Sequence, residues 1–173
     1  MNRSFLVAAA VLCVLPATPA SAAEIFGGLY VHDVDTVLTK SGIESGADVV
    51  VGWRGDRIGA TPLQPHVFGG LNTDGNTSYA AAGISARFGT RVYLRPGLGI
   101  AIHNGFTGDF ERPEGDRIAF GSRVLFEPEI AVGVQLNPRT SIEASWVHLS
   151  HAQLLSSQNP GLDNFGVRLN VGL

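Results

Sequence analysis

The feature of this sequence that most constrains its fold is an alternation of apolar and polar side chains with a period of two residues. It is clearest over residues 164–173, where Phe165, Val167, Leu169, Val171 and Leu173 alternate with Asn164, Gly166, Arg168, Asn170 and Gly172. Successive side chains of a β-strand point to opposite faces. The pattern therefore predicts strands with one apolar face and one polar face, and it recurs within residues 92–103, 124–136 and 141–146.

Strand-like segments recur along the whole chain and are separated by Gly, Pro, Asn and Asp. We count eight of them, at residues 24–34, 47–54, 65–72, 78–88, 91–103, 117–135, 140–150 and 162–173. We expect the sixth segment to be broken or bent near Pro128. The segments between the strands are alternately long and short, which is typical of an up-and-down barrel with long outer loops and tight periplasmic turns.

The N-terminus has the features of a secretory signal peptide. Arg3 supplies a positive charge, residues 5–15 form an apolar stretch, and Ala20-Ser21-Ala22 is a small-residue cleavage site. We therefore predict that residues 1–22 are removed and that residues 23–173 form one domain. The single cysteine, Cys13, lies in the predicted signal peptide, so we expect no disulfide in the mature chain.

The composition favours an exported membrane barrel. Charged residues make up 16% of the chain, below the roughly 25% of an ordinary soluble domain, and there are 22 glycines. No apolar run after residue 22 approaches the roughly 20 residues of a spanning helix. The net charge of −3 gives no case for nucleic-acid binding. We predict an all-β fold, an eight-stranded antiparallel up-and-down transmembrane β-barrel in the bacterial outer membrane. Because alternation alone does not tell inside from outside, a secreted lipocalin-like carrier remains an alternative.

The polar face of the predicted strands carries charges of both signs. An eight-stranded barrel is just wide enough inside for side chains to fill it. We expect these charges to form an ion network that plugs the lumen, and therefore no pore. The predicted members are Arg95, Arg123, Arg168, Glu127, Glu129 and Glu143.

Three polar residues break the apolar stripes of the last two strands. His148 and Ser150 share the parity of Trp146, and Asp163 shares that of Phe165, so all three are expected on the lipid-facing side. Sequential antiparallel strands bring them to the same outer rim. Ser, His and a carboxylate are the residue types of a hydrolytic triad. We predict that Ser150 is the nucleophile, His148 the general base and Asp163 the residue that orients the base.

The motifs around these residues carry a family resemblance. Residues 148–152 read His-Leu-Ser-His-Ala, and residues 159–163 read Asn-Pro-Gly-Leu-Asp. They resemble the His-x-Ser-Asn-Ala and Asn-x-Gly-x-Glu signature of the outer-membrane lipid A 3-O-deacylases. Those are eight-stranded barrels that hydrolyse the ester-linked acyl chain at position 3 of lipid A. The resemblance implies the same roles for Ser150 and His148, with Asp163 as the acid and Asn159 at the oxyanion site.

The chain departs from this pattern at three positions. Asp163 stands where the family has Glu, with one more residue in the preceding loop. His151 replaces the Asn after the nucleophile, and we keep it beside Asn159 as a second candidate for the oxyanion or substrate contact. Leu173 ends the chain where outer-membrane barrels usually have an aromatic residue.

The expected chemistry uses no cofactor and no metal, since His148, His151 and Asp163 lack the ligand spacing of known zinc motifs. The expected partners are lipid A or lipopolysaccharide as substrate and the lipids of the outer membrane, and a homodimer is left open. A second hypothesis is a non-enzymatic structural or adhesive barrel. Trp146 is expected in an aromatic girdle or the lumen rather than in contact with substrate. His32 receives no role, because the sequence offers it no partner.

Overall fold

The computed structural model describes residues 23–39, 42–108 and 117–173. The predicted signal peptide, residues 1–22, lies outside the described part of the chain. The described residues form nine strands: β1 (Glu24–Val31), β2 (Ala47–Arg54), β3 (Leu63–Asn72), β4 (Tyr79–Ala86), β5 (Phe88–Gly89), β6 (Val92–His103), β7 (Val124–Asn137), β8 (Thr140–Leu149) and β9 (Leu162–Gly172). They include no helix that is long and apolar enough to cross a membrane.

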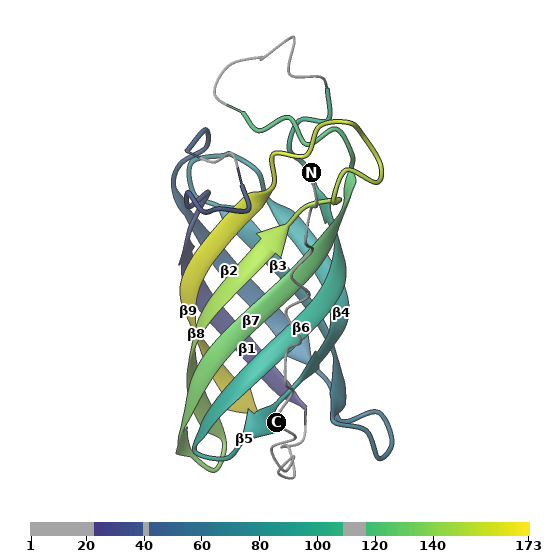
Figure 1. Cartoon of the computed structure of the whole chain (residues 1–173). Coiled ribbons are helices and arrows are strands. Elements are labelled where there is room, and N and C mark those ends of the chain that lie inside the picture. The colour runs from purple at the N-terminus through teal and green to yellow at the C-terminus, as the bar shows by residue number, and fades with distance from the viewer. Residues whose placement is uncertain (1–22, 40–41, 109–116) are drawn as a thin grey trace, which may run out of the picture.

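The strands form one closed antiparallel barrel (Figure 1). Each long strand pairs with its neighbours in sequence, and β1 pairs with β9 from Glu24↔Gly172 to Val31↔Phe165. The short strand β5 pairs with β6, as β4 does, so β4 and β5 are two parts of one strand that is interrupted at Arg87. The prediction of an eight-stranded up-and-down barrel is therefore confirmed.

The sixth predicted segment differs most from the observed strand. It was expected over residues 117–135, but β7 begins at Val124. Ile118 and Phe120 are buried in the loop before β7, so they give a strand-like apolar signal without belonging to the barrel wall. The strand is not broken near Pro128, because β7 continues through it and pairs there with Leu98. The register shift lies further along the strand, between Gln135 and Asn137.

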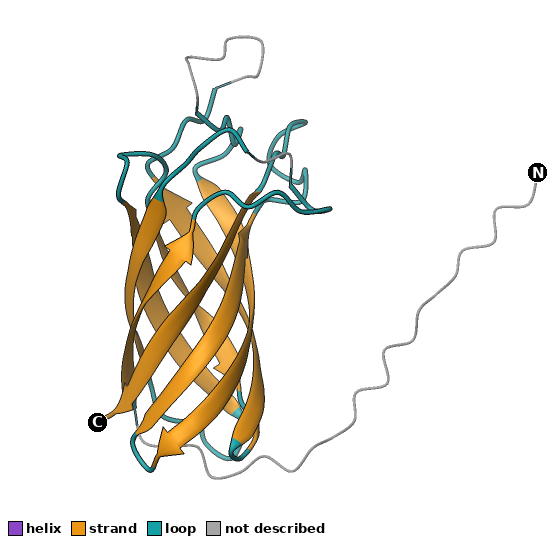
Figure 2. Cartoon of the chain, turned by 90° about the vertical axis from the view of Figure 1, so that its left-hand side faces the viewer, coloured by secondary structure: helices purple, strands orange, loops and turns teal. Residues whose placement is uncertain are grey.

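Three of the four connections at one end of the barrel are longer than any connection at the other end (Figure 2). The described residues of the loops β1–β2 (within 32–46), β3–β4 (73–78), β6–β7 (within 104–123) and β8–β9 (150–161) all lie at one end, the long-loop end. The connections after β2, β5 and β7 lie at the other end. The first and last described residues also meet there, since the Leu173 N–H donates to the Ala23 carbonyl at 2.8 Å.

Apolar side chains cover the outside of the barrel, and charged side chains fill the inside. Arg95 donates to Glu143 at 2.9 Å, and Arg168 donates to Glu129 at 2.8 Å. Arg168 also pairs with Glu143, and all of these side chains are buried. The network extends beyond the predicted set to Glu24, Gln64 and Arg54.

Arg123 was predicted in this network and lies outside it. It precedes the first residue of β7, so the alternation of the strand does not apply to it. Its exposed side chain donates to the carbonyls of His103 and Gly105 at 2.7 and 2.9 Å. Glu127 lies in the lumen as expected, where its nearest polar contact is the His66 Nε2, 3.4 Å away.

Candidate active site

The end of β8 and the start of β9 bring the predicted site residues together. His148 and Asp163 are directly opposite each other in the β8–β9 register. Ser150 follows the last residue of β8, and a bridge to Phe126 of β7 fixes its backbone. The Ser150 N–H donates to the Phe126 carbonyl at 3.1 Å, and the Phe126 N–H donates to the Ser150 carbonyl at 2.7 Å. The barrel wall therefore holds all three backbones.

The three side chains form a continuous hydrogen-bonded relay. His148 Nδ1 lies 2.7 Å from Asp163 Oδ1, and His148 Nε2 lies 2.8 Å from Ser150 Oγ. A carboxylate only accepts hydrogen bonds, so Nδ1 carries the proton and donates to Asp163. This tautomer leaves Nε2 as the acceptor for the Ser150 hydroxyl. The imidazole is thus oriented to take a proton from Ser150.

Asp163 is held by more groups than the histidine alone. The indole Nε1–H of Trp146 donates to the same Oδ1 at 2.8 Å. The hydroxyl of Thr36, from the β1–β2 loop, donates to the other oxygen, Oδ2. The backbone carbonyl of Asp163 also accepts the Val34 N–H at 2.8 Å. These contacts fix both the main chain and the carboxylate plane of Asp163.

The site lies on the outward parity of both strands, yet it is covered. His148 and Ser150 are only 7% and 8% exposed, although their parity places them on the lipid-facing side. The cover comes from the β1–β2 loop, whose Thr39 packs against Gly161. Gly161 has φ 73°, and a Cβ there would lie 2.9 Å from the Thr39 methyl and 3.2 Å from His148 Cε1. The fold therefore requires glycine beside the imidazole.

Asn159 and His151 lie next to Ser150 but contribute differently. The His151 backbone N–H donates to Asn159 Oδ1 at 3.0 Å, which fixes the orientation of the asparagine amide. The His151 imidazole is fully buried and its Nε2–H donates to the Phe120 carbonyl at 2.8 Å. That ring therefore ties the β8–β9 loop to the β6–β7 loop.

An ion cluster anchors the loop that covers the site. His32 lies between Asp48 and Glu44, with nitrogen–oxygen distances of 2.9 and 3.0 Å. Burial by itself lowers the pKa of His32, but the two carboxylates outweigh this effect and raise the pKa to about 9. Glu44 also accepts hydrogen bonds from the backbone N–H groups of Thr77 and Ile118, so the cluster joins three of the long loops.

This cluster connects to the catalytic candidates through Asn164. The side-chain amide of Asn164 donates to Asp48 at 2.9 Å, and its carbonyl oxygen accepts the Asp33 N–H at 3.1 Å. Asn164 follows Asp163 directly in β9. The base of the β1–β2 loop and the acid of the relay are therefore fixed by adjacent residues.

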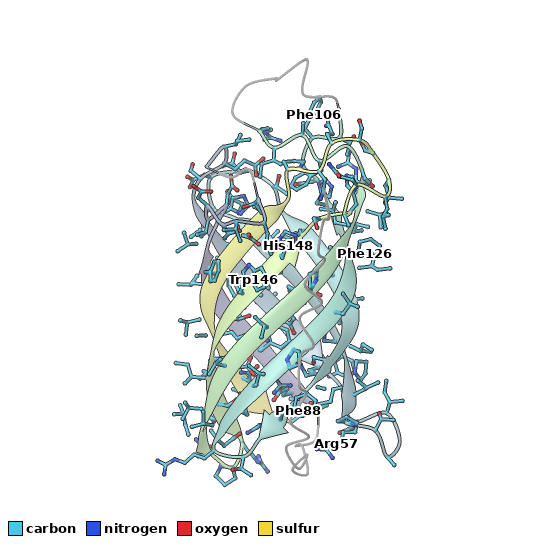
Figure 3. The ribbon with its side chains drawn as sticks, viewed as in Figure 1. Arg57, Phe88, Phe106, Phe126, Trp146 and His148 are labelled. Carbon is cyan, nitrogen blue, oxygen red and sulfur yellow. The ribbon has the colours of Figure 1, made fainter. Side chains whose placement is uncertain are left out.

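An apolar groove lies on the outer wall just below the relay. It has a volume of about 570 Å³, and Trp146, Phe165, Ile130 and Val132 are among its lining residues, together with the small Ala144 and Gly166. The rings of Trp146 and Phe165 stack, with centroids 6.1 Å apart. Figure 3 shows Trp146 beside His148, on the side toward the middle of the barrel. Trp146 therefore both lines the groove and contacts Asp163 of the relay.

The sequence profile of the family described as lipid A 3-O-deacylase (PagL) matches residues 47–171 of this chain. The chain belongs to the PagL family. Among curated proteins, none matches the chain by sequence. The crystal structure of the outer membrane enzyme PagL is similar, with a TM-score of 0.60 and 18% identity over 87% of this chain and 99% of that one. At this identity the likeness supports the fold alone.

Two other solved structures have weaker similarity. The Yersinia pestis protein Ail is 14% identical and Neisserial surface protein A is 12% identical. Each match covers 87% of this chain and at least 97% of the other, with a TM-score of 0.49. PagL-family membership and the barrel architecture place the chain in the outer membrane.

Sequence reasoning missed three residues that support the relay. Trp146 was assigned to a girdle or the lumen, although its parity with His148 was a signal that it borders the site. Thr36 and His32 gave no such signal, because loop residues follow no strand periodicity and Thr36 is 127 positions from Asp163. In this member of the PagL family, the loop supplies part of the support for the acid.

Proposed function

We propose that this protein is a lipid A 3-O-deacylase, a serine esterase that hydrolyses the acyl chain at position 3 of lipid A in the outer leaflet. The observation that carries the proposal is the relay from Ser150 through His148 to Asp163 on the outward face of the barrel. A purely structural barrel has no need of such a relay, and membership of the PagL family supports lipid A as the substrate class.

In the first half-reaction, Ser150 Oγ attacks the carbonyl carbon of the ester while His148 Nε2 takes the hydroxyl proton. Asp163 stabilises the resulting imidazolium and holds its tautomer. The tetrahedral intermediate then expels the sugar hydroxyl, which receives the proton from His148. This leaves the acyl chain bound to Ser150 as an ester.

In the second half-reaction, His148 takes a proton from a water molecule that attacks the acyl-enzyme. The second tetrahedral intermediate expels the Ser150 oxygen, which regains its proton from His148. The products are a free fatty acid and lipid A with a free hydroxyl at position 3. No step needs a metal or a cofactor.

Asn159 is the side-chain candidate for stabilising the oxyanion. Its Oδ1 accepts the His151 N–H, which leaves the amide Nδ2–H groups to donate to the charged oxygen. Removing one such donor from a hydrolase costs roughly 2.7–4 kcal/mol of transition-state stabilisation. His151 is assigned a positioning role rather than an oxyanion contact, because its ring is bound to Phe120.

The apolar groove supports a lipid substrate over a small soluble ester. It begins at Trp146, which lies two residues before His148 on the same face of β8. It runs along lipid-facing residues such as Phe165 and Ile130. An acyl chain in this groove would place its ester bond at the rim, where Ser150 lies. The sugar would then remain at the level of the long loops.

The test is the acylation of lipid A in bacteria that express the protein. Mass spectrometry is expected to show loss of one ester-linked acyl chain with the wild type and no loss with Ser150→Ala or His148→Ala. Ser157→Ala is the matched control, since this exposed serine lies in the same loop and outside the relay. Identical lipid A in cells with wild type and Ser150→Ala would reject the proposal and favour a non-enzymatic barrel.

A further inference from the structure

Two of the long loops carry exposed pairs of aliphatic side chains. Val37 is fully exposed and Leu38 is exposed beside it in the β1–β2 loop. Leu154 is 72% exposed and is followed by exposed Leu155 in the β8–β9 loop. Single exposed apolar residues are common on protein surfaces, but consecutive pairs at two loop tips beside one site are not accounted for by that background.

The first pair is continuous with the lipid-facing wall of the barrel. Thr36, next to Val37, donates its hydroxyl to Asp163, which shares the outward parity of Phe165 and Val167. A Cβ added at Gly161 would lie 3.6 Å from the carbonyl oxygen of Leu38. The loop is therefore folded against the outside of the barrel at β9, and its tip extends the apolar surface that faces the membrane.

The second pair follows Ser150 on the other side of the relay. A tight turn from His151 to Leu154 presents it, with the Leu154 N–H donating to the His151 carbonyl at 2.9 Å. Residues 152–160 contain no Asp, Glu, Lys or Arg. A charged side chain in the apolar part of a bilayer is costly, and this segment carries none into it.

The connection between β2 and β3 offers a comparison with these two tips. Ile58, in the connection between β2 and β3, is exposed to a similar degree but follows Asp56 and Arg57 directly. Two adjacent charges keep such a turn at the aqueous surface. The tips beside the site lack this feature, since Asp35 and Lys40 each lie two positions away from the Val37–Leu38 pair and residues 152–160 carry no charge.

We propose that Val37, Leu38, Leu154 and Leu155 form two lipid-inserted tips that bind among the acyl chains of the outer leaflet. The tips stand on the β9 side and the β8 side of the relay, so Ser150 lies below the level of the lipid headgroups. The inference goes beyond the proposed function, because it concerns the depth of the loops and holds whether or not the protein hydrolyses lipid.

The test measures the depth of single labels in proteoliposomes. Val37→Cys, Leu154→Cys, Ile58→Cys and Val167→Cys are each made in a Cys13→Ala background and labelled with an environment-sensitive fluorophore. The liposomes are phosphatidylcholine with a fraction spin-labelled near the top of the acyl chain. Val167, on the lipid face of β9, is 52% exposed and Ile58 is 50% exposed, so the two controls differ in location and not in exposure.

Labels at Val37→Cys and Leu154→Cys are expected to lose fluorescence to the same extent as Val167→Cys, while Ile58→Cys retains its signal. Folding of each variant is verified by its heat-modifiable migration in electrophoresis. If either loop label behaves like Ile58→Cys, its tip lies in water and the inference fails. Because the readout is independent of hydrolysis, that failure is distinct from the absence of deacylase activity.

Discussion

The indole of Trp146 and the imidazole of His148 donate to the same oxygen of Asp163, at 2.8 and 2.7 Å. The hydroxyl of Thr36 binds the other oxygen. Asp has one methylene fewer than the Glu of the family signature. Trp146 and Thr36 together hold the shorter carboxylate within reach of His148. Under the proposed mechanism, Trp146 and Thr36 are positioning residues that act through Asp163.

Trp146→Phe keeps an aromatic ring in the groove and removes the indole donor. A hydrogen bond to a charged group contributes roughly 1.5–3 kcal/mol, so we expect a loss of about tenfold or more in kcat. The measurement is the rate of acyl release from purified lipid A. Trp53→Phe, on the outer face of β2, is the matched control and is expected to keep the wild-type rate. An unchanged rate in Trp146→Phe would exclude a positioning role.

Thr36→Val preserves the shape of the side chain and removes its hydroxyl. We expect kcat to fall about fivefold to tenfold with little change in KM, because the change acts on Asp163 and not on substrate binding. Thr36→Ser should restore most of the rate, since it restores the donor. Thr61→Val in the β2–β3 connection is the control for a generic threonine substitution. Equal losses in Thr36→Ser and Thr36→Val would contradict this explanation.

Asp163→Asn tests the orientation of the base. An amide in this position can donate to Nδ1 and so favour the wrong tautomer of His148, which in a serine protease triad lowers kcat about 10⁴-fold. We expect a loss of about 10³-fold or more here. The measurement is single-turnover acyl release, with the folded barrel verified by its heat-modifiable migration. Retention of more than a tenth of the activity would show that Asp163 does not orient the base.

The cluster around His32 predicts how the loops respond to pH. The pKa of His32 is raised from 6.5 to about 9, so the folded loops stabilise its charged form. That stabilisation is complete below about pH 6.5 and is lost as the pH rises through 9. Hydrogen-exchange protection of the Thr77 and Ile118 amides, corrected for intrinsic rates, is expected to fall across this range. A His32→Gln protein should lack this pH-dependent step, and a step of equal size in that variant would refute the assignment.

The lumen network predicts a large stability effect at Glu143. Its carboxylate accepts from Arg95, Arg168 and Tyr93, so Glu143→Gln removes one of the two carboxylates that pair with each of these buried guanidinium groups. Breaking a buried ion pair from one side costs about 3–5 kcal/mol. Denaturant unfolding in liposomes measures the change. Arg123→Gln removes a charge that lies outside the lumen, and it is expected to cost much less than Glu143→Gln.

The architecture of the wall could be predicted from the sequence because strand alternation is a local property. The backbone geometry alone sends Phe165 and Arg168 to opposite faces, whatever the neighbouring strands are. The same parity placed His148, Ser150 and Asp163 on one face, and sequential antiparallel strands placed them at one rim. Residues 117–123, Arg123 among them, were wrongly assigned to a strand, because the buried loop residues Ile118 and Phe120 imitate its apolar pattern without sharing its geometry.

The sequence by itself determined the barrel, its strand number and the three residues of the relay. Only the tertiary structure decided what holds and covers that relay. The contacts of Asp163 with Thr36, and of Asn164 with Asp48 and Asp33, join segments that are far apart in the chain. Such contacts depend on the closure of β1 against β9 and on the folding of loops across the rim. Neither the closure of the barrel nor the folding of the loops is encoded in a local periodicity. The burial and the hydrogen-bonded support of the site therefore follow from the closed barrel.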